Sequence, residues 1–266
     1  MRLKISHHTS YHYDEPVQYA LQQLRLTPKT NVSQKVISWS TTIKGGREEV
    51  EFDDHNNNRV VLISFEPGCQ SVSFLSEGEV ETTDTSGIIG KHGGYAPLWY
   101  FKRYTELTTP GPHVRSLVKE LGNDFCDDVN KMHELSELVE RKVVYETGRT
   151  DSSTKAEDTL EVGHGVCQDH THVFICAVRL MGLPARYVSG YLMIDDRIDQ
   201  EASHAWAEVY ISDVGWIGFD VSNRISPDHR YVRVATGLDY REAAPISGMR
   251  YGDSSESMEV SLQVQQ

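Results

Sequence analysis

The stretch Gly163-His-Gly-Val-Cys-Gln-Asp169 decides how the second half of the chain is organised, because it marks the start of a helix. Apolar residues recur after it at helical spacing, namely Val173, Phe174, Ala177, Leu180 and Met181. Gly182 and Pro184 then supply the signals that end a helix. We therefore expect Cys167 in the first turn of a helix, behind a segment with two glycines.

Strand patterns follow this helix. Apolar residues alternate with period two over residues 185–192, 204–211 and 215–220, which predicts neighbouring antiparallel strands. Weaker signals at residues 231–234 and 260–264 are expected to complete the same sheet. Two helices are predicted ahead of it, over residues 112–121 and 127–145, and the polar stretch 147–165 is expected to be an exposed loop. Helices first and strands after give an α+β layout.

The chain before residue 87 has a different pattern. Apolar residues alternate with Ser and Thr up to about residue 84, and Asn- and Asp-rich or Pro-Gly segments separate the alternating runs. No helix of useful length is expected there. We predict an all-β, sandwich-like domain over residues 1–86, a Gly-rich linker over 87–110 and an α+β core over 111–266.

Composition excludes several classes of protein. The 266 residues include 26 Lys and Arg against 39 Asp and Glu, a formal net charge of −13, which is the wrong sign for nucleic-acid binding. With 38% hydrophobic and 24% charged residues, the composition is that of neither a disordered chain nor a membrane protein. The N-terminus has no apolar run typical of a signal peptide, so we expect a cytoplasmic protein.

The four cysteines, Cys69, Cys126, Cys167 and Cys176, follow no CxxC spacing. Cys167 is the candidate nucleophile, because a helix N-terminus favours the thiolate and the flanking glycines let a carbonyl approach its backbone N–H, a plausible oxyanion donor. Cys176 points to the opposite side of the helix and is expected in the core. The alternative for Cys167 is a buried structural cysteine.

A metal site is a second alternative for this segment. His164, His170 and His172 lie close to Cys167 in sequence, and Cys167 shares a helix face with His170. His172 points elsewhere, however, and no CxxC pair supplies further thiolates. We therefore predict no metal and no cofactor, and the sequence has no EF-hand loop for Ca²⁺.

A nucleophilic cysteine needs a base and a group that orients the base. His204 begins a predicted strand, with Trp206 two residues later on the same face. A hairpin centred near Val214 would place His204 opposite Asn223 or Arg224, with Asp220 a few residues away. Counting along the strands therefore leaves Asp220 and Asn223 both open as the orienting group.

Four motifs together resemble the core of bacterial transglutaminase-like proteins: Gly165-Val-Cys-Gln-Asp169, Gly182-Leu-Pro-Ala-Arg-Tyr-Val-Ser-Gly-Tyr191, Ser203-His-Ala-Trp206 and Gly215-Trp-Ile-Gly-Phe-Asp220. The N-terminal strands resemble the β-domain that often precedes this core, and residues 232–248 resemble its tail. The resemblance implies a papain-like fold with a triad of Cys167, His204 and Asp220. Between Asp220 and Asn223, it selects Asp220.

Other site residues are less defined by the resemblance. His170-Thr171 stands where the family has an aromatic and a small residue, which is expected to alter the groove beside the nucleophile. Tyr145 is the candidate second oxyanion donor, and Gln168 and Trp206 are candidates for lining the substrate groove. The acidic loop over residues 195–201 is expected to be solvated, with an acidic rim that favours cationic substrates as the alternative.

These features predict a cysteine-dependent acyl-transfer enzyme that attacks amide bonds of a peptide or protein substrate. We expect a protease or amidase, in which water resolves the thioester. The alternatives are a transglutaminase, in which an amine does so, and a binding or scaffold protein that keeps the fold without turnover. The sequence predicts no nucleic-acid or membrane partner, and it does not indicate the oligomeric state.

Overall fold

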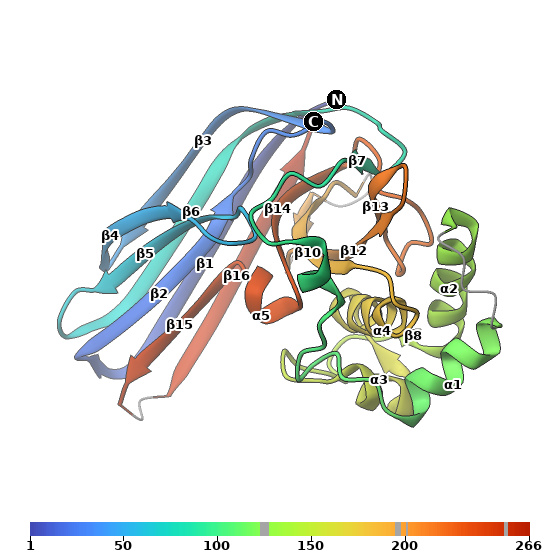
Figure 1. Ribbon diagram of the computed structural model, residues 1–266. Helices are drawn as coiled ribbons and strands as arrows, with labels where there is room; N and C mark the ends of the chain where they lie inside the picture. The colour runs from blue at the N-terminus through green and yellow to red at the C-terminus, as the bar shows by residue number, and fades with distance from the viewer. Residues whose placement is uncertain (123–127, 195–197, 201, 253–254) are drawn as a thin grey trace.

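The computed structural model describes residues 1–122, 128–194, 198–200, 202–252 and 255–266. Figure 1 shows a group of long strands beside a helical region that has a smaller sheet of its own. The first six strands are β1 (Arg2–Val17), β2 (Tyr19–Thr27), β3 (Gln34–Lys44), β4 (Gly46–Asp53), β5 (Arg59–Phe65) and β6 (Cys69–Thr82).

These strands form two sheets that face each other. One has the order β11-β16-β1-β6-β3 and the other the order β15-β2-β5-β4, where β11 is Asp199–Gln200, β15 is Ile246–Tyr251 and β16 is Glu256–Gln265. Side chains of β1 and β6, such as Tyr11 and Phe74, pack in one cluster with Leu24 of β2 and Ile63 of β5. The predicted β-sandwich is confirmed, because residues of β1, β2, β5 and β6 are buried together between the two sheets.

The last two strands also belong to this sandwich. β15 (Ile246–Tyr251) pairs with β2, and β16 (Glu256–Gln265) pairs with β1 over its whole length, so the red strands of Figure 1 lie among the blue ones. The prediction that residues 260–264 complete the sheet of the core is therefore wrong. Alternation identifies a strand but not its partner. The boundaries 1–86, 87–110 and 111–266 stay a prediction.

The helical region holds α1 (Pro112–Leu121), α2 (Val129–Lys142), α3 (Ala156–Val162), α4 (Cys167–Leu180), α5 (Tyr240–Ala243) and the 3₁₀ helix η1 (Leu98–Lys102). Helices α1 and α4 have their predicted limits, whereas α2 is shorter than expected. The polar stretch 147–165 contains α3, which the sequence analysis missed. Glu157 of α3 accepts hydrogen bonds from the backbone N–H groups of Gly111, His113 and Val114, so α3 caps α1.

The sheet of this region has the order β14-β10-β12-β13-β7. Its strands are β7 (Ile88–Gly90), β10 (Ala185–Leu192), β12 (His204–Ile211), β13 (Gly215–Phe219) and β14 (Tyr231–Gly237). Two short strands, β8 (Val144–Tyr145) and β9 (His164–Gly165), pair in parallel, and β11 (Asp199–Gln200) pairs with β16.

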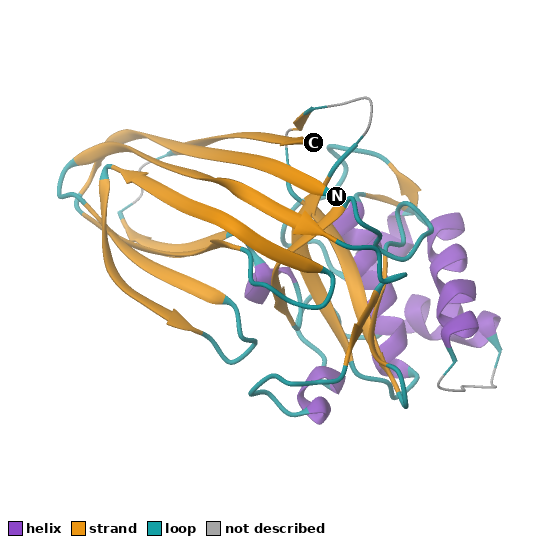
Figure 2. Cartoon of the chain, turned by 90° about the horizontal axis from the view of Figure 1, so that it is seen from above, coloured by secondary structure: helices purple, strands orange, loops and turns teal. Residues whose placement is uncertain are grey.

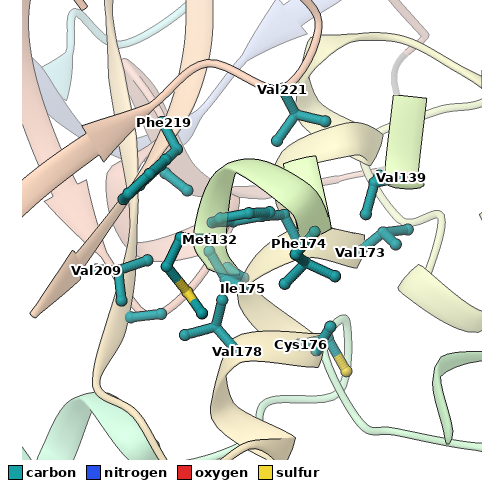
Figure 3. Close-up of a cluster of buried hydrophobic side chains, with 14 of the residues drawn as sticks. Met132, Val139, Val173, Phe174, Ile175, Cys176, Val178, Val209, Phe219 and Val221 are labelled. Carbon is teal, nitrogen blue, oxygen red and sulfur yellow. The ribbon is translucent and has the colours of Figure 1, made fainter. Parts of the chain in front are cut away.

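Helix α4 packs against this sheet and is buried along most of its length. Figure 3 shows Val173, Phe174 and Ile175 of α4 among side chains of α2 and of the sheet. Cys176 is fully buried there, as expected for the face opposite Cys167. A helix held on so many sides gives its first turn a fixed position. Among the described residues, no helix is both long and apolar enough to cross a membrane.

The two regions meet along β14, an edge strand of the core sheet. The side-chain amide of Gln34 donates to the carbonyl of Arg233 and accepts from its N–H, both at 2.8 Å. Asn58 makes the same pair of bonds with Thr236, also at 2.8 Å. The contact is visible from above in Figure 2, where the long strands abut the smaller sheet. Side chains thus satisfy the backbone groups that an edge strand would leave open.

Candidate active site

Cys167 is the first residue of α4 and is partly exposed. The Asp169 carboxylate, fully buried, accepts from the Val166 N–H at 2.8 Å and from the Thr150 hydroxyl at 2.6 Å. A Cβ on Gly165 would lie 2.7 Å from the Asp169 Cβ, so glycine is required where the chain passes this carboxyl group. The segment predicted from its glycines is therefore held tightly in front of the helix.

His204 and Asp220 are in direct contact. The His204 Nε2–H donates to Asp220 Oδ2 at 2.6 Å; the His204 side chain is 14% exposed and that of Asp220 is fully buried. The hairpin tip lies at Asp213, one residue before the expected position, and pairing of β12 with β13 ends at Ala207 and Phe219. The chain then turns back and bridges Asp220 to Ile225, which brings Asp220 to His204.

Asn223, the alternative orienting group, bonds Asp220 instead of the imidazole. Its side-chain amide donates to Asp220 Oδ2 at 2.8 Å and its backbone N–H to Oδ1 at 3.1 Å. The hydroxyl of Tyr231 on β14 donates to Oδ2 at 2.7 Å. Tyr231 could not be predicted from the sequence, since only the pairing of β14 with β10 brings it to the site.

The charge of Asp220 keeps His204 protonated. Burial lowers the pKa of His204, but the charge and hydrogen bond of Asp220 and a hydrogen bond with Cys167 raise it to about 10. Burial raises the pKa of Asp220, yet the His204 charge and the bonds from His204, Asn223 and Tyr231 leave it lowered. Because Nε2 bonds Asp220, Nδ1 is the nitrogen that remains for the thiol.

The other predicted site residues lie at different depths. Tyr145 is 55% exposed and is brought beside the Cys167 segment by pairing with Gly165. Gln168 is partly exposed and makes one long hydrogen bond, 3.5 Å from its Nε2 to the Asp151 carbonyl. Trp206 is only 2% exposed, and its assignment to the substrate groove stays a prediction. Its ring stacks on His204 and is covered by Tyr231.

A pocket of about 580 Å³ opens at His204 and Tyr145. The remaining lining residues are Leu192, Met193, Ile194, Ser222, Asn223, Ile225, Arg230 and Tyr231. Five of these eight side chains are apolar or aromatic, and they come from the end of β10 and the two residues after it, from the turn after Asp220 and from β14. The pocket therefore offers an apolar wall beside the imidazole.

The histidines around Cys167 have separate partners. His164 Nδ1 lies 2.8 Å from Glu146 Oε2, His170 bonds Val143 and Ser222, and His172 Nε2 accepts from the Tyr240 N–H. Among the described residues, no group of three or more His, Cys, Asp or Glu side chains is arranged to hold a metal ion.

Two of the other cysteines are described. Burial raises the pKa of Cys69, and burial also raises the pKa of Cys176 to about 12. Cys126 lies outside the described residues, as do residues 195–197 and 201 of the acidic loop, so the acidic rim stays a prediction.

Comparisons with known proteins find similarity in both parts of the chain. A family model described as the transglutaminase-like superfamily matches residues 115–221, and one for the bacterial transglutaminase-like N-terminal region matches residues 3–81. An uncharacterised protein of Mycobacterium leprae is 25% identical, with 99% of this chain and 98% of the relative covered. A protein-glutamine gamma-glutamyltransferase of Pseudomonas aeruginosa is 28% identical over 102 residues, 33% of this chain and 15% of the relative.

One solved structure shares the fold over the whole chain. It is a candidate cysteine protease of Cytophaga hutchinsonii, with a TM-score of 0.76 and 24% identity, and the match covers 100% of this chain and 91% of that one. The papain-like core and the preceding β-sandwich are thus found together in a second protein. The chain belongs to the transglutaminase-like superfamily and carries the N-terminal region of its bacterial members.

Proposed function

We propose that the protein is a cysteine-dependent enzyme that hydrolyses amide bonds in peptides or proteins, with Cys167, His204 and Asp220 as its catalytic triad. The observation that carries the proposal is the 2.6 Å bond between His204 and buried Asp220, next to a cysteine at a helix N-terminus. An imidazolium and a helix N-terminus both favour a thiolate at such a position.

In the first half of the reaction, the Cys167 sulfur adds to the amide carbonyl carbon. His204 transfers its Nδ1 proton to the leaving nitrogen, the C–N bond breaks, and a thioester and a free amine result. Asp220 keeps Nε2 in place and stabilises the charged ring. In the second half, His204 takes a proton from water and the hydroxide adds to the thioester. The C–S bond then breaks, the carboxylic acid leaves, and the Cys167 thiolate and protonated His204 are restored.

Two donors are available for the carbonyl oxygen. The backbone N–H of Cys167 is in the first turn of α4, where N–H groups have no partner within the helix. Burial and the charges of Cys167, Asp220 and Asp169 raise the pKa of Tyr145, so its hydroxyl keeps its proton and can donate. We assign these two groups to the oxyanion hole.

The pocket supports a substrate class. Leu192, Met193, Ile194 and Ile225 line one wall beside His204. Burying an aliphatic side chain there gains roughly 1.5–3 kcal/mol. We therefore propose that an apolar residue flanks the scissile amide.

Transfer to an amine is the second candidate, favoured by the name of the Pseudomonas aeruginosa relative. A panel of peptidyl coumarin amides, assayed with and without a dansylated primary amine, separates the two reactions. We expect coumarin release with a free acid as the main product, and none from Cys167→Ala. Mainly dansylated product would favour the transferase. Activity in Cys167→Ala would overturn cysteine catalysis. No coumarin release by the wild type, together with no reaction of the native thiol with a peptidyl epoxide, would favour a scaffold.

A further inference from the structure

His170 lies one helical turn after Cys167 and is 1% exposed. It is the residue at which this sequence departs from the aromatic of the family pattern, and the proposed mechanism gives it no part. Its ring nitrogens have different partners: Nε2 lies 3.0 Å from the Val143 carbonyl oxygen and Nδ1 lies 2.8 Å from Ser222 Oγ. Both contacts join α4 to other segments of the chain.

These partners fix the tautomer of His170. A carbonyl oxygen can only accept, so Nε2 carries the proton and donates to Val143. Nδ1 is then an acceptor, and the Ser222 hydroxyl donates to it. Burial lowers the pKa of His170, against the hydrogen bond to Val143 and the charges of Asp169, Asp220 and Glu140, which raise it. The neutral ring satisfies both partners at once.

The two bonds join the three segments of the proposed site. His170 is on α4, which begins with Cys167, and Val143 lies two residues before Tyr145, whose ring centroid is 6.0 Å from that of His170. Ser222 is in the turn that follows Asp220. One imidazole therefore links the nucleophile, the candidate oxyanion donor and the orienting acid.

The link to Ser222 acts on Asp220 through the turn. Asn223, next in the chain, donates to both carboxylate oxygens of Asp220, and Asp220 accepts from His204. If Ser222 shifts, Asn223 shifts with it, and the carboxylate loses two of its donors. A displaced carboxylate no longer meets His204 at 2.6 Å.

We propose that His170 is a positioning residue: through Ser222 it holds the turn that carries Asp220, and so keeps that carboxylate against His204. The inference rests on the proposed function only for its effect on turnover. The titration midpoint of His204 can be measured without a substrate and therefore does not depend on the proposed function. His170 itself touches neither substrate nor the reacting atoms.

The test is an NMR titration of the His204 ring in His170→Phe. Phenylalanine keeps the ring beside Tyr145 but loses both hydrogen bonds. We expect the titration midpoint of His204 to fall from about 10 by at least about one unit, because Asp220 supplies much of the increase. In the amide assay, kcat should fall about 10-fold with KM within about twofold, since only the triad is disturbed.

Ser222→Ala removes the same bond from the other side, on a half-buried side chain where folding is not at risk. It should lower the His204 midpoint similarly, and the double variant should be no worse than His170→Phe alone. Additive effects of the two changes, or a wild-type midpoint in either variant, would overturn the proposal.

His172→Phe is the matched control, because His172 is a fully buried histidine on the same helix whose bond is to Tyr240. It should cost stability but leave the His204 midpoint and kcat unchanged. If the His204 midpoint and kcat both fall in this control, the loss of any buried hydrogen bond in α4 has the same effect. That result would count against a specific role for His170. An active Cys167→Ala variant, with a lowered midpoint in His170→Phe, would overturn the mechanism and leave the positioning intact.

Discussion

The side chain of Gln34 pairs with the backbone of Arg233 as a neighbouring strand would, accepting from its N–H and donating to its carbonyl, both at 2.8 Å. The two residues belong to different sheets. Through this pair, β3 of the sandwich fixes the edge of the sheet that presents Tyr231 and, through it, Asp220. The sandwich therefore has a mechanical connection to the site.

Gln34→Ala should destabilise the fold by roughly 1–3 kcal/mol, because it removes a buried side-chain amide and leaves the N–H and carbonyl of Arg233 without these partners. Urea unfolding measures the change. Gln70→Ala removes an exposed amide with one 3.3 Å bond and should stay within about 0.5 kcal/mol of wild type. Equal effects of the two changes would contradict the role given to Gln34.

Cys167 should be alkylated by iodoacetamide near neutral pH well before Cys69 and Cys176. Burial raises the pKa of both of these thiols, that of Cys176 to about 12, so neither holds much thiolate. Peptide mapping after a short exposure identifies the labelled residue. Earlier labelling of Cys69 or Cys176 in the folded protein would refute the assignment of the nucleophile.

Asp220→Ala should lower kcat by about 10³–10⁴-fold, because the imidazolium loses its counter-charge and its orientation. Asp220→Asn should lose less, since an amide can still accept from Nε2. Asn223→Ala should cost about 10-fold or less, because Asn223 supports Asp220 but does not bond the ring. Steady-state kinetics rank the three variants. The reverse order of the two alanine variants would make Asn223 the orienting residue.

The pair His204–Asp220 should stabilise the protein in a defined pH window. The folded-state pKa of His204 is raised from 6.5 to about 10, so its contribution is complete below 6.5 and is lost as pH rises through about 10. Asp220 has a lowered pKa, so its contribution persists above its ordinary value of 3.8. The Tm difference between wild type and Asp220→Asn should shrink from near pH 6 to near pH 10. A constant difference would argue against the ion pair.

Ile194→Asp should lower kcat/KM for substrates with a leucine beside the scissile amide, by about 10-fold or more, through loss of apolar contact in the pocket. Ile198→Asp is the matched control, because Ile198 is 51% exposed and does not line the pocket, whereas Ile194 is 41% exposed and does. Equal kcat/KM for leucyl and glutamyl substrates in the wild type would contradict the proposed apolar subsite.

Local patterns predicted much of the core. The start and end of α4 could be predicted because glycines and apolar spacing act within a few residues. The contact of His204 with Asp220 could not be counted from the strands, since it depends on where the ladder ends and on a turn that holds Arg224 at a φ of 56°. The family resemblance supplied that pair.

Long-range packing accounts for the errors. Period two also does not show how deeply Trp206 lies, because Tyr231 from β14 covers it and a Cβ on Gly190 would lie 2.5 Å from its ring. The partner of β16 could not be predicted from alternation, because any sheet with a free edge satisfies it. Helix α3 is short and polar, and its role in capping α1 depends on tertiary contact.

The return of β15 and β16 to the first sheets has a consequence for synthesis on the ribosome. Strands β1 and β2 are synthesised before the core, yet each lacks the neighbour that covers one of its edges until the whole core has been made. In the nascent chain, one edge of β1 and one edge of β2 therefore stay unpaired while the helical region is synthesised. Unpaired strand edges are sites at which chains aggregate. A chain cut before Ile246 would hold every residue of the proposed triad. Its sandwich would still lack β15 and β16, so that β1 and β2 would remain open edge strands.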